Sequence, residues 1–218
     1  MVVRGVDPEL YPDVTEAGGV GPALAAVRER LGIEPGPLEA PNGSLVRTGN
    51  GGVTLLRGER GFRVTLAGKG FRAEGVTGDL DEAARALDFW RAGITLRELA
   101  DRFPFVSYDG LAQAYENGTH IEYRWNEALT DPDLAGYRER FAAVHAHPVL
   151  GRLKPLISHR YMLRLSVPPD EEIMLSFLPD EVRIEPSWEE GRPRHARSTA
   201  EAIDVAAALL AERQRTRS

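Results

Sequence analysis

The segment Ser158-His159-Arg160 brings together a hydroxyl, an imidazole and a guanidinium, three groups that enzymes use in catalysis. Histidine changes its charge between about pH 5 and 8, which suits it to accept or donate a proton. Adjacent residues of an extended chain project to opposite faces, so we expect that Ser158 and His159 cannot form a nucleophile–base pair with each other. His159 is therefore the candidate catalytic acid or base, and the alternative is a structural role at the start of a strand.

A second candidate site lies near the C-terminus, where Arg192, Arg194 and Arg197 precede Ser198. Ser198 is expected to cap the last helix, and the N–H groups of a helix N-terminus bind anions, as arginine side chains do. The segment therefore predicts a site for a carboxylate or a phosphate. The alternative is a solvated loop whose positive charge compensates nearby glutamates such as Glu189.

Two further features have both a structural and a functional interpretation. His145 and His147 lie at the end of a predicted helix, where residues two apart point to nearly opposite sides and do not share a metal ion. Since no third ligand follows at a typical spacing, we expect no metal, no cofactor, and imidazoles that bind the last helical carbonyls. Trp188 lies in a polar stretch and is a candidate partner contact, whereas Trp90 lies on an apolar helical stripe and is expected in the core.

The elements that would position these residues are helices and short antiparallel strands. Asp79 and Thr95 each begin a capping pattern, and Phe62, Val64 and Leu66 alternate with polar residues as in a half-buried strand. Helices are expected over 21–31, 80–92, 96–102, 111–115, 119–129 and 131–147, and a final helix begins at Ser198 and includes Leu210; strands are expected over 53–57, 62–66, 71–76, 160–167, 173–178 and 182–185.

This order of elements predicts an α+β fold in which antiparallel hairpins and meanders are flanked by helices. Two similar halves each consist of helices, then a run of strands, then helix. We expect one compact domain over residues 1–218, with 1–106 and 107–218 as possible sub-lobes.

Composition limits the class of protein. The 218 residues are 42% hydrophobic and 28% charged, which is typical of a globular chain. A net charge of −6 argues against general nucleic-acid binding, and no stretch reaches the roughly 18 apolar residues of a membrane span. Because the chain has no cysteine and no secretory pattern, we expect a cytoplasmic protein; its oligomeric state stays open.

Several blocks of the chain resemble an uncharacterised bacterial family of the actinobacterial type, whose members are loosely labelled natural-product biosynthesis proteins. The blocks are Phe89–Leu99 with Arg102–Val106, and His147–Leu150 continuing through Leu153 and Pro155 to Ser158-His159, Leu163 and Leu165-Ser166. The resemblance spans most of the chain, from the first predicted helix to the last. It implies a role in specialised-metabolite biosynthesis and brings no catalytic residues with it.

The leading hypothesis is an accessory protein of such a pathway that binds a pathway enzyme, a precursor peptide or a small-molecule intermediate without catalysing a reaction. An extended peptide could bind by strand addition to an exposed hairpin edge. The first alternative is a small metal-free enzyme that uses His159 as acid or base and the arginine-rich segment for an anionic substrate. The second is an immunity-type protein that neutralises a toxin.

Overall fold

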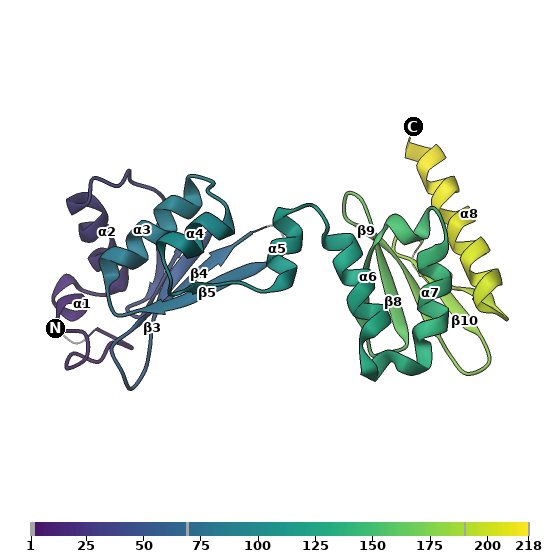
Figure 1. Ribbon diagram of the computed structural model, residues 1–218, viewed down its shortest axis with the longest axis horizontal. Helices are drawn as coiled ribbons and strands as arrows, with labels where there is room; N and C mark the ends of the chain where they lie inside the picture. Colours follow the sequence, from purple (N-terminus) through teal and green to yellow (C-terminus); the bar gives the residue numbers. More distant parts are fainter. Residues whose placement is uncertain (1–2, 69, 190, 218) are drawn as a thin grey trace. The chain divides into compact units, whose positions relative to one another are not determined.

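The computed structural model describes residues 3–68, 70–189 and 191–217, and the chain forms two compact units, residues 1–117 (unit 1) and 118–218 (unit 2) (Figure 1). The division follows Asn117 and not residue 106, because the short helix between these positions contributes Ala112 to the core of unit 1. The single domain expected from the sequence stays a prediction. Within the described ranges, no helix has the length and the apolar character needed to cross a membrane.

Unit 1 contains a six-stranded antiparallel meander in which the strands lie in chain order. The central hairpin joins β3 to β4 through residues 56–61, whereas the strands predicted over 53–57 and 62–66 leave a connection of residues 58–61. The strands are β1 (Glu39–Asn42), β2 (Leu45–Thr48), β3 (Gly51–Leu55), β4 (Phe62–Ala67), β5 (Arg72–Thr77) and β6 (Val106–Ser107).

The described residues of unit 1 also form five helices, some of which pack on one face of this meander. They are α1 (Pro12–Ala17), α2 (Val20–Arg30), α3 (Leu80–Arg91), α4 (Leu96–Arg102) and α5 (Gly110–Glu116). The predicted caps are confirmed: the Asp79 side chain accepts a hydrogen bond from the Asp81 N–H, and Thr95 forms a complete capping box with Glu98. Both caps satisfy backbone donors that a helix leaves unpaired in its first turn.

The core of unit 1 lies between the helices and the sheet. Phe62, Val64 and Leu66 of β4 are fully buried, while the alternating Arg63 is exposed. Helices α2 and α3 pack on this buried face and against each other, which Figure 1 shows as a layer of helices over β3, β4 and β5. Trp90, expected in the core, is only partly buried and packs against the core, and its indole N–H donates to the carbonyl of Ala67 at the end of β4 at 3.1 Å.

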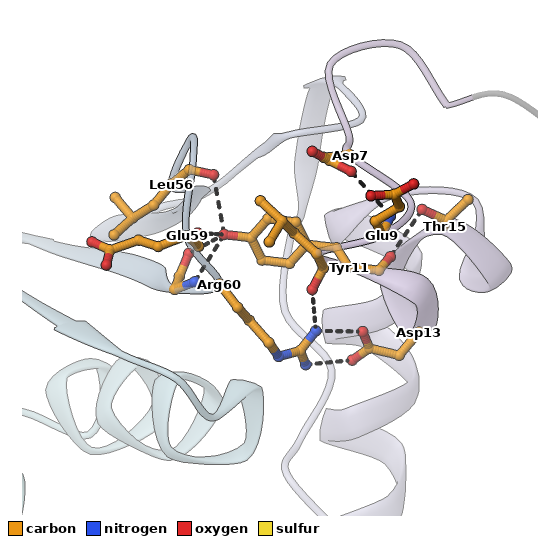
Figure 2. Close-up of polar contacts among 10 residues, drawn as sticks. Asp7, Glu9, Tyr11, Asp13, Thr15, Leu56, Glu59 and Arg60 are labelled. Carbon is orange, nitrogen blue, oxygen red and sulfur yellow. Dashed lines mark hydrogen bonds and ion pairs between the residues drawn. The ribbon is translucent and has the colours of Figure 1, made fainter.

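A buried tyrosine ties the N-terminal segment to the β3–β4 loop (Figure 2). The Tyr11 hydroxyl, in a residue that is 1% exposed, accepts from the Gly61 N–H at 2.8 Å and lies 2.8–3.1 Å from the carbonyls of Leu56, Glu59 and Gly61. The following loop residue, Arg60, forms a bidentate ion pair with Asp13. These contacts fix the loop against α1.

Unit 2 is a second layer of helices on a five-stranded antiparallel meander, in the spatial order β11-β10-β9-β8-β7. Its core is formed by alternate residues of β8, β9 and β10 together with Trp125, Phe141 and the inner face of the last helix. Its strands are β7 (Lys154–Ser158), β8 (Met162–Val167), β9 (Glu171–Phe177), β10 (Val182–Pro186) and β11 (Arg194–Ala196). Its helices are α6 (His120–Thr130), α7 (Arg138–Ala146) and α8 (Thr199–Arg217), with short 3₁₀ segments at Pro132–Tyr137 and Leu150–Arg152.

The α+β fold class predicted from the sequence is confirmed, and both units read as helices, antiparallel strands and helix. One predicted helix differs in its first part. The chain starts to coil at Asp131-Pro132 as expected, but residues 132–137 form a 3₁₀ segment and α7 begins only at Arg138. Gly136 lies in this segment, and glycine lowers the stability of an α-helical turn.

Candidate functional site

His159 lies on the turn that joins β7 to β8. His159 and Arg160 both have positive φ angles, 52° and 61°, so the chain is not extended there. This corrects the expectation that Ser158 and His159 cannot interact: the turn places the Ser158 Oγ 2.9 Å from Nδ1 of His159. The expectation was wrong because it assumed a strand geometry that begins only at Met162.

The surroundings of His159 offer little to hold a substrate. His159 is exposed, and its neighbour Arg160 makes a 3.4 Å ion pair with Asp133 in which both side chains are about 70% exposed. A hollow lies between α6 and β7, but its lining includes Leu156 and Ile157 and not His159. The structure thus provides a hydrogen-bonded Ser–His pair on the surface, and no carboxylate of a described residue is hydrogen-bonded to this imidazole.

The arginines of the C-terminal segment do not converge on one site. Arg192 lines a hollow that also contains Glu172, Glu185 and Glu189, and Arg194 forms an ion pair with Glu189 at 2.8 Å. Arg197 lines a different hollow, together with Asp180, Glu181, His195 and Glu201. Arg194 is therefore already paired, and an anion that entered either of the two hollows would meet carboxylates of the lining.

The helix N-terminus in this segment is also occupied. Ser198 caps α8 by accepting from the Glu201 N–H at 3.1 Å, and the Glu201 carboxylate accepts from the Arg197 N–H at 2.7 Å. A side-chain carboxylate already holds the position that an anionic ligand would take. Trp188, the candidate partner contact, is partly buried and packs against the core of unit 2.

His145 and His147 were expected to bind the last carbonyls of their helix, and the structure shows other contacts for both side chains. His145 stacks on Trp125 with ring centroids 4.8 Å apart. Nδ1 of His147 accepts from the N–H groups of Val149 and Leu150, which begin the 3₁₀ turn after α7, at 3.3 Å each. In the part of the chain that the structure covers, no group of three His, Asp or Glu residues is placed to hold a metal ion.

The outer strands of both sheets carry features that discourage strand addition. β1 contains Pro41 and an irregular register, and β7 contains Pro155. β6 has only two residues, and β11 has three and follows Pro193. Proline lacks the N–H that a new strand would bind, and short or irregular edge strands offer few bonds. These edges are poor templates for an extended peptide.

A pocket in unit 1, the arginine pocket, combines apolar walls with two guanidinium groups. Its volume is about 210 Å³, and it opens between α2, the segment after α2, the β2–β3 turn and α3. The apolar part of the wall comes from Leu24, Pro37 and Leu87, and the polar part from Thr48, Asn50, Asp88 and the two arginines Arg28 and Arg91. Leu24 and Arg28 are four residues apart on α2, as are Leu87 and Arg91 on α3, so each helix presents one apolar and one cationic side chain to the same space.

Arg28 is the most unusual residue of this pocket. It is only 9% exposed, its Nη2 donates to the Glu34 carbonyl at 2.7 Å, and it forms no ion pair with any described residue. Burial, and then the positive charge of Arg91, lower the pKa of the Arg28 guanidinium, while Asp88 acts in the opposite direction. A buried cation without a paired anion is costly, so the site favours an added negative charge.

Arg91 and Gly36 complete the cationic end of the pocket. Nη2 of Arg91 donates to Asp88 at 2.7 Å, which leaves its Nη1 directed elsewhere. A Cβ on Gly36 would lie 3.1 Å from Nη1 of Arg91 and 3.2 Å from Nη2 of Arg28. Both guanidinium groups therefore approach the same point of the backbone, and glycine leaves room for them there.

The sequence contains a weak signal for this site. Arg28 follows Leu24 at helical spacing and so falls on the apolar face of α2, where an arginine is unusual. Arg91 on α3 is 63 residues further along the chain, and the β2–β3 turn at residues 48–50 belongs to another part of the sheet, so only the fold brings these parts together. No family model, curated protein or solved structure matches this chain, so its site is interpreted from its own residues.

Proposed function

We propose that this protein is a non-catalytic accessory protein of specialised-metabolite biosynthesis and that it binds a small anionic intermediate in the arginine pocket. The observation that carries the proposal is the buried Arg28, which faces an apolar hollow and has no ion pair with any described residue. The biosynthetic context rests on the family resemblance of the sequence. A cysteine-free chain fits a reducing cytoplasm, where such pathways operate.

The chemistry of the pocket lining supports binding rather than catalysis. Arginine stays protonated at neutral pH and is a poor acid or base. The one carboxylate of the lining, Asp88, is hydrogen-bonded to Arg91. The Thr48 hydroxyl has no imidazole, lysine or free carboxylate beside it among the lining residues. The lining can hold and neutralise an anion, but it lacks a group suited to move a proton.

The experiment that tests this proposal is native mass spectrometry of the full chain purified from the organism that carries its gene. Arg28→Met removes the buried charge at similar length, and Arg85→Met is the matched control, because Arg85 is an exposed residue of α3 outside the pocket lining. We expect a stoichiometric small acid on the wild type and on Arg85→Met but not on Arg28→Met. Equal retention by all three proteins would remove the arginine pocket from the function.

One observation favours the enzyme alternative, namely the 2.9 Å contact between Ser158 Oγ and His159 Nδ1. An enzyme that uses this pair should lose turnover of a pathway intermediate in His159→Ala while its fold is retained. If our proposal holds, His159→Ala keeps the bound acid, because His159 lies in unit 2 and the arginine pocket lies in unit 1.

A further inference from the structure

We infer that the ligand of the arginine pocket is a small monocarboxylate with an apolar body, and that the pocket selects against dianions such as phosphate monoesters. This inference rests on the proposed function, because it specifies the chemistry of the molecule bound at the same site. Three features of the described residues carry it: the free donors, the charge count and the size of the hollow.

The donors available in the pocket match the two oxygens of a carboxylate. Nη2 of Arg28 is bonded to the Glu34 carbonyl and Nη2 of Arg91 to Asp88. The two Nη1 groups make no hydrogen bond with any described residue, and they lie 3.8 Å and 3.1 Å from the Cβ position of Gly36. One Nη1 group from each arginine can therefore donate to one oxygen of a carboxylate bound next to Gly36.

The charges around the pocket balance one negative charge on the ligand. Arg28 and Arg91 contribute two positive charges, and Asp88 contributes one negative charge that is already hydrogen-bonded to Arg91. An adjoining hollow shares Arg28 and Gly36 with the pocket, and its lining also includes Glu29 and Glu34, which are both exposed to solvent. A monoanion would neutralise the single positive charge that Asp88 leaves on the two arginines, whereas a dianion would leave an excess negative charge next to Asp88.

The size and the wall of the pocket define the rest of the ligand. The arginine pocket itself has a volume of about 210 Å³, which is room for a single ring or a short chain, and the adjoining hollow that shares Arg28 and Gly36 has about 570 Å³. Leu24, Pro37 and Leu87 form apolar walls next to the guanidinium groups. A ligand with its carboxylate at Gly36 would place an apolar body against these walls.

The test is isothermal titration of the full-length protein at pH 7.5 with three probes of similar size: benzoate, phenyl phosphate and benzyl alcohol. Phenyl phosphate is mostly a dianion at this pH, and benzyl alcohol is neutral. We expect benzoate to bind roughly tenfold or more tightly than either of the other probes. Tighter binding of phenyl phosphate would overturn this inference and leave the proposed function standing, whereas binding of neither anion would overturn both.

Two variants examine the donors and the charge count separately. Gly36→Ala places a methyl group against both guanidinium groups and should weaken benzoate binding roughly tenfold, while circular dichroism shows that the fold is kept. Asp88→Asn removes the carboxylate that limits the positive charge, so it should raise the affinity for phenyl phosphate relative to benzoate by about tenfold. An unchanged ratio in Asp88→Asn would show that charge does not set the selectivity.

Discussion

The replacement of Tyr11 by phenylalanine removes the hydroxyl oxygen from a buried polar cluster, here called the cradle. The cradle consists of this hydroxyl, the Gly61 N–H and the carbonyls of Leu56, Glu59 and Gly61. In the wild type this hydroxyl accepts from the Gly61 N–H at 2.8 Å and has three carbonyl oxygens within 3.1 Å, to one of which it donates at a time. The Gly61 carbonyl keeps a second partner, because it also accepts from the Leu56 N–H at 2.9 Å. The Gly61 N–H loses the acceptor that Figure 2 shows as the centre of the cradle.

The expected loss follows from these contacts. A buried donor without an acceptor costs about 1–3 kcal/mol, and the lost hydroxyl donation costs about 1 kcal/mol. Because the loop can relax and admit water, we expect the free energy of unfolding of unit 1 to fall by about 2–3 kcal/mol. With a urea slope of about 1–2 kcal/mol per molar for a unit of this size, the unfolding midpoint should fall by about 1–3 M.

Hydrogen exchange measured by mass spectrometry gives this loss for each unit separately. In Tyr11→Phe, peptides from the sheet of unit 1 should exchange on the order of 30- to 100-fold faster, while peptides from residues 118–218 should not change. Tyr108→Phe is the matched control, since Tyr108 is a partly buried tyrosine of unit 1 whose hydroxyl makes no hydrogen bond with any described residue. If both variants lost the same small amount, below about 0.5 kcal/mol, the cradle would not stabilise unit 1.

Three further perturbations have defined outcomes. Arg28→Met should change the free energy of unfolding of the ligand-free protein by less than about 1 kcal/mol, because removal of a buried charge offsets the lost hydrogen bond to the Glu34 carbonyl. Urea denaturation measures this change, and a loss above about 2 kcal/mol would mean that Arg28 has a structural role. Arg60 holds the pKa of Asp13 below its usual 3.8, so the stability from this pair is present above about pH 4 and is lost as the pH falls through the lowered pKa. Between pH 5 and 3 the free energy of unfolding should therefore fall more in the wild type than in Asp13→Asn, by less than about 1 kcal/mol because the pair is largely exposed. Parallel pH profiles of the two proteins would contradict this. Thr95→Ala, which breaks the capping box of α4, should cost about 1 kcal/mol in thermal unfolding, and an unchanged melting temperature would show that the cap is not formed in solution.

Local features of the fold could be predicted from the sequence because short-range physics decides them. Two kinds of feature depend only on neighbours within a few residues: the alternating burial along β4, with Phe62, Val64 and Leu66 inside, and the helix caps at Asp79 and Thr95. The structure confirms both. Turn geometry was harder to predict. The positive φ angles of His159 and Arg160, which bring Ser158 and His159 together, have no glycine or asparagine to signal them.

The arginine pocket could not be predicted, because its parts meet only when the helices pack on the sheet. Arg28, Gly36 and Arg91 belong to α2, the connection after it and the end of α3, and no spacing in the sequence indicates that they face each other. The arginine-rich segment 192–197 is a more visible signal in the sequence, yet Arg194 is paired with Glu189, and Arg192 and Arg197 line two different hollows that contain carboxylates. A cluster of charges in the sequence does not reveal which of them has a partner.

The central claim is that Arg28 and Arg91 hold the carboxylate of a small ligand in unit 1. Anomalous diffraction from crystals of the protein grown with 4-bromobenzoate tests it most directly, because the bromine position locates the ligand without reference to the protein density. We expect one strong bromine peak in the pocket between α2 and α3, with the carboxylate oxygens within about 3 Å of the two Nη1 groups. A bromine peak elsewhere, or none in the pocket at a saturating concentration, would contradict the account.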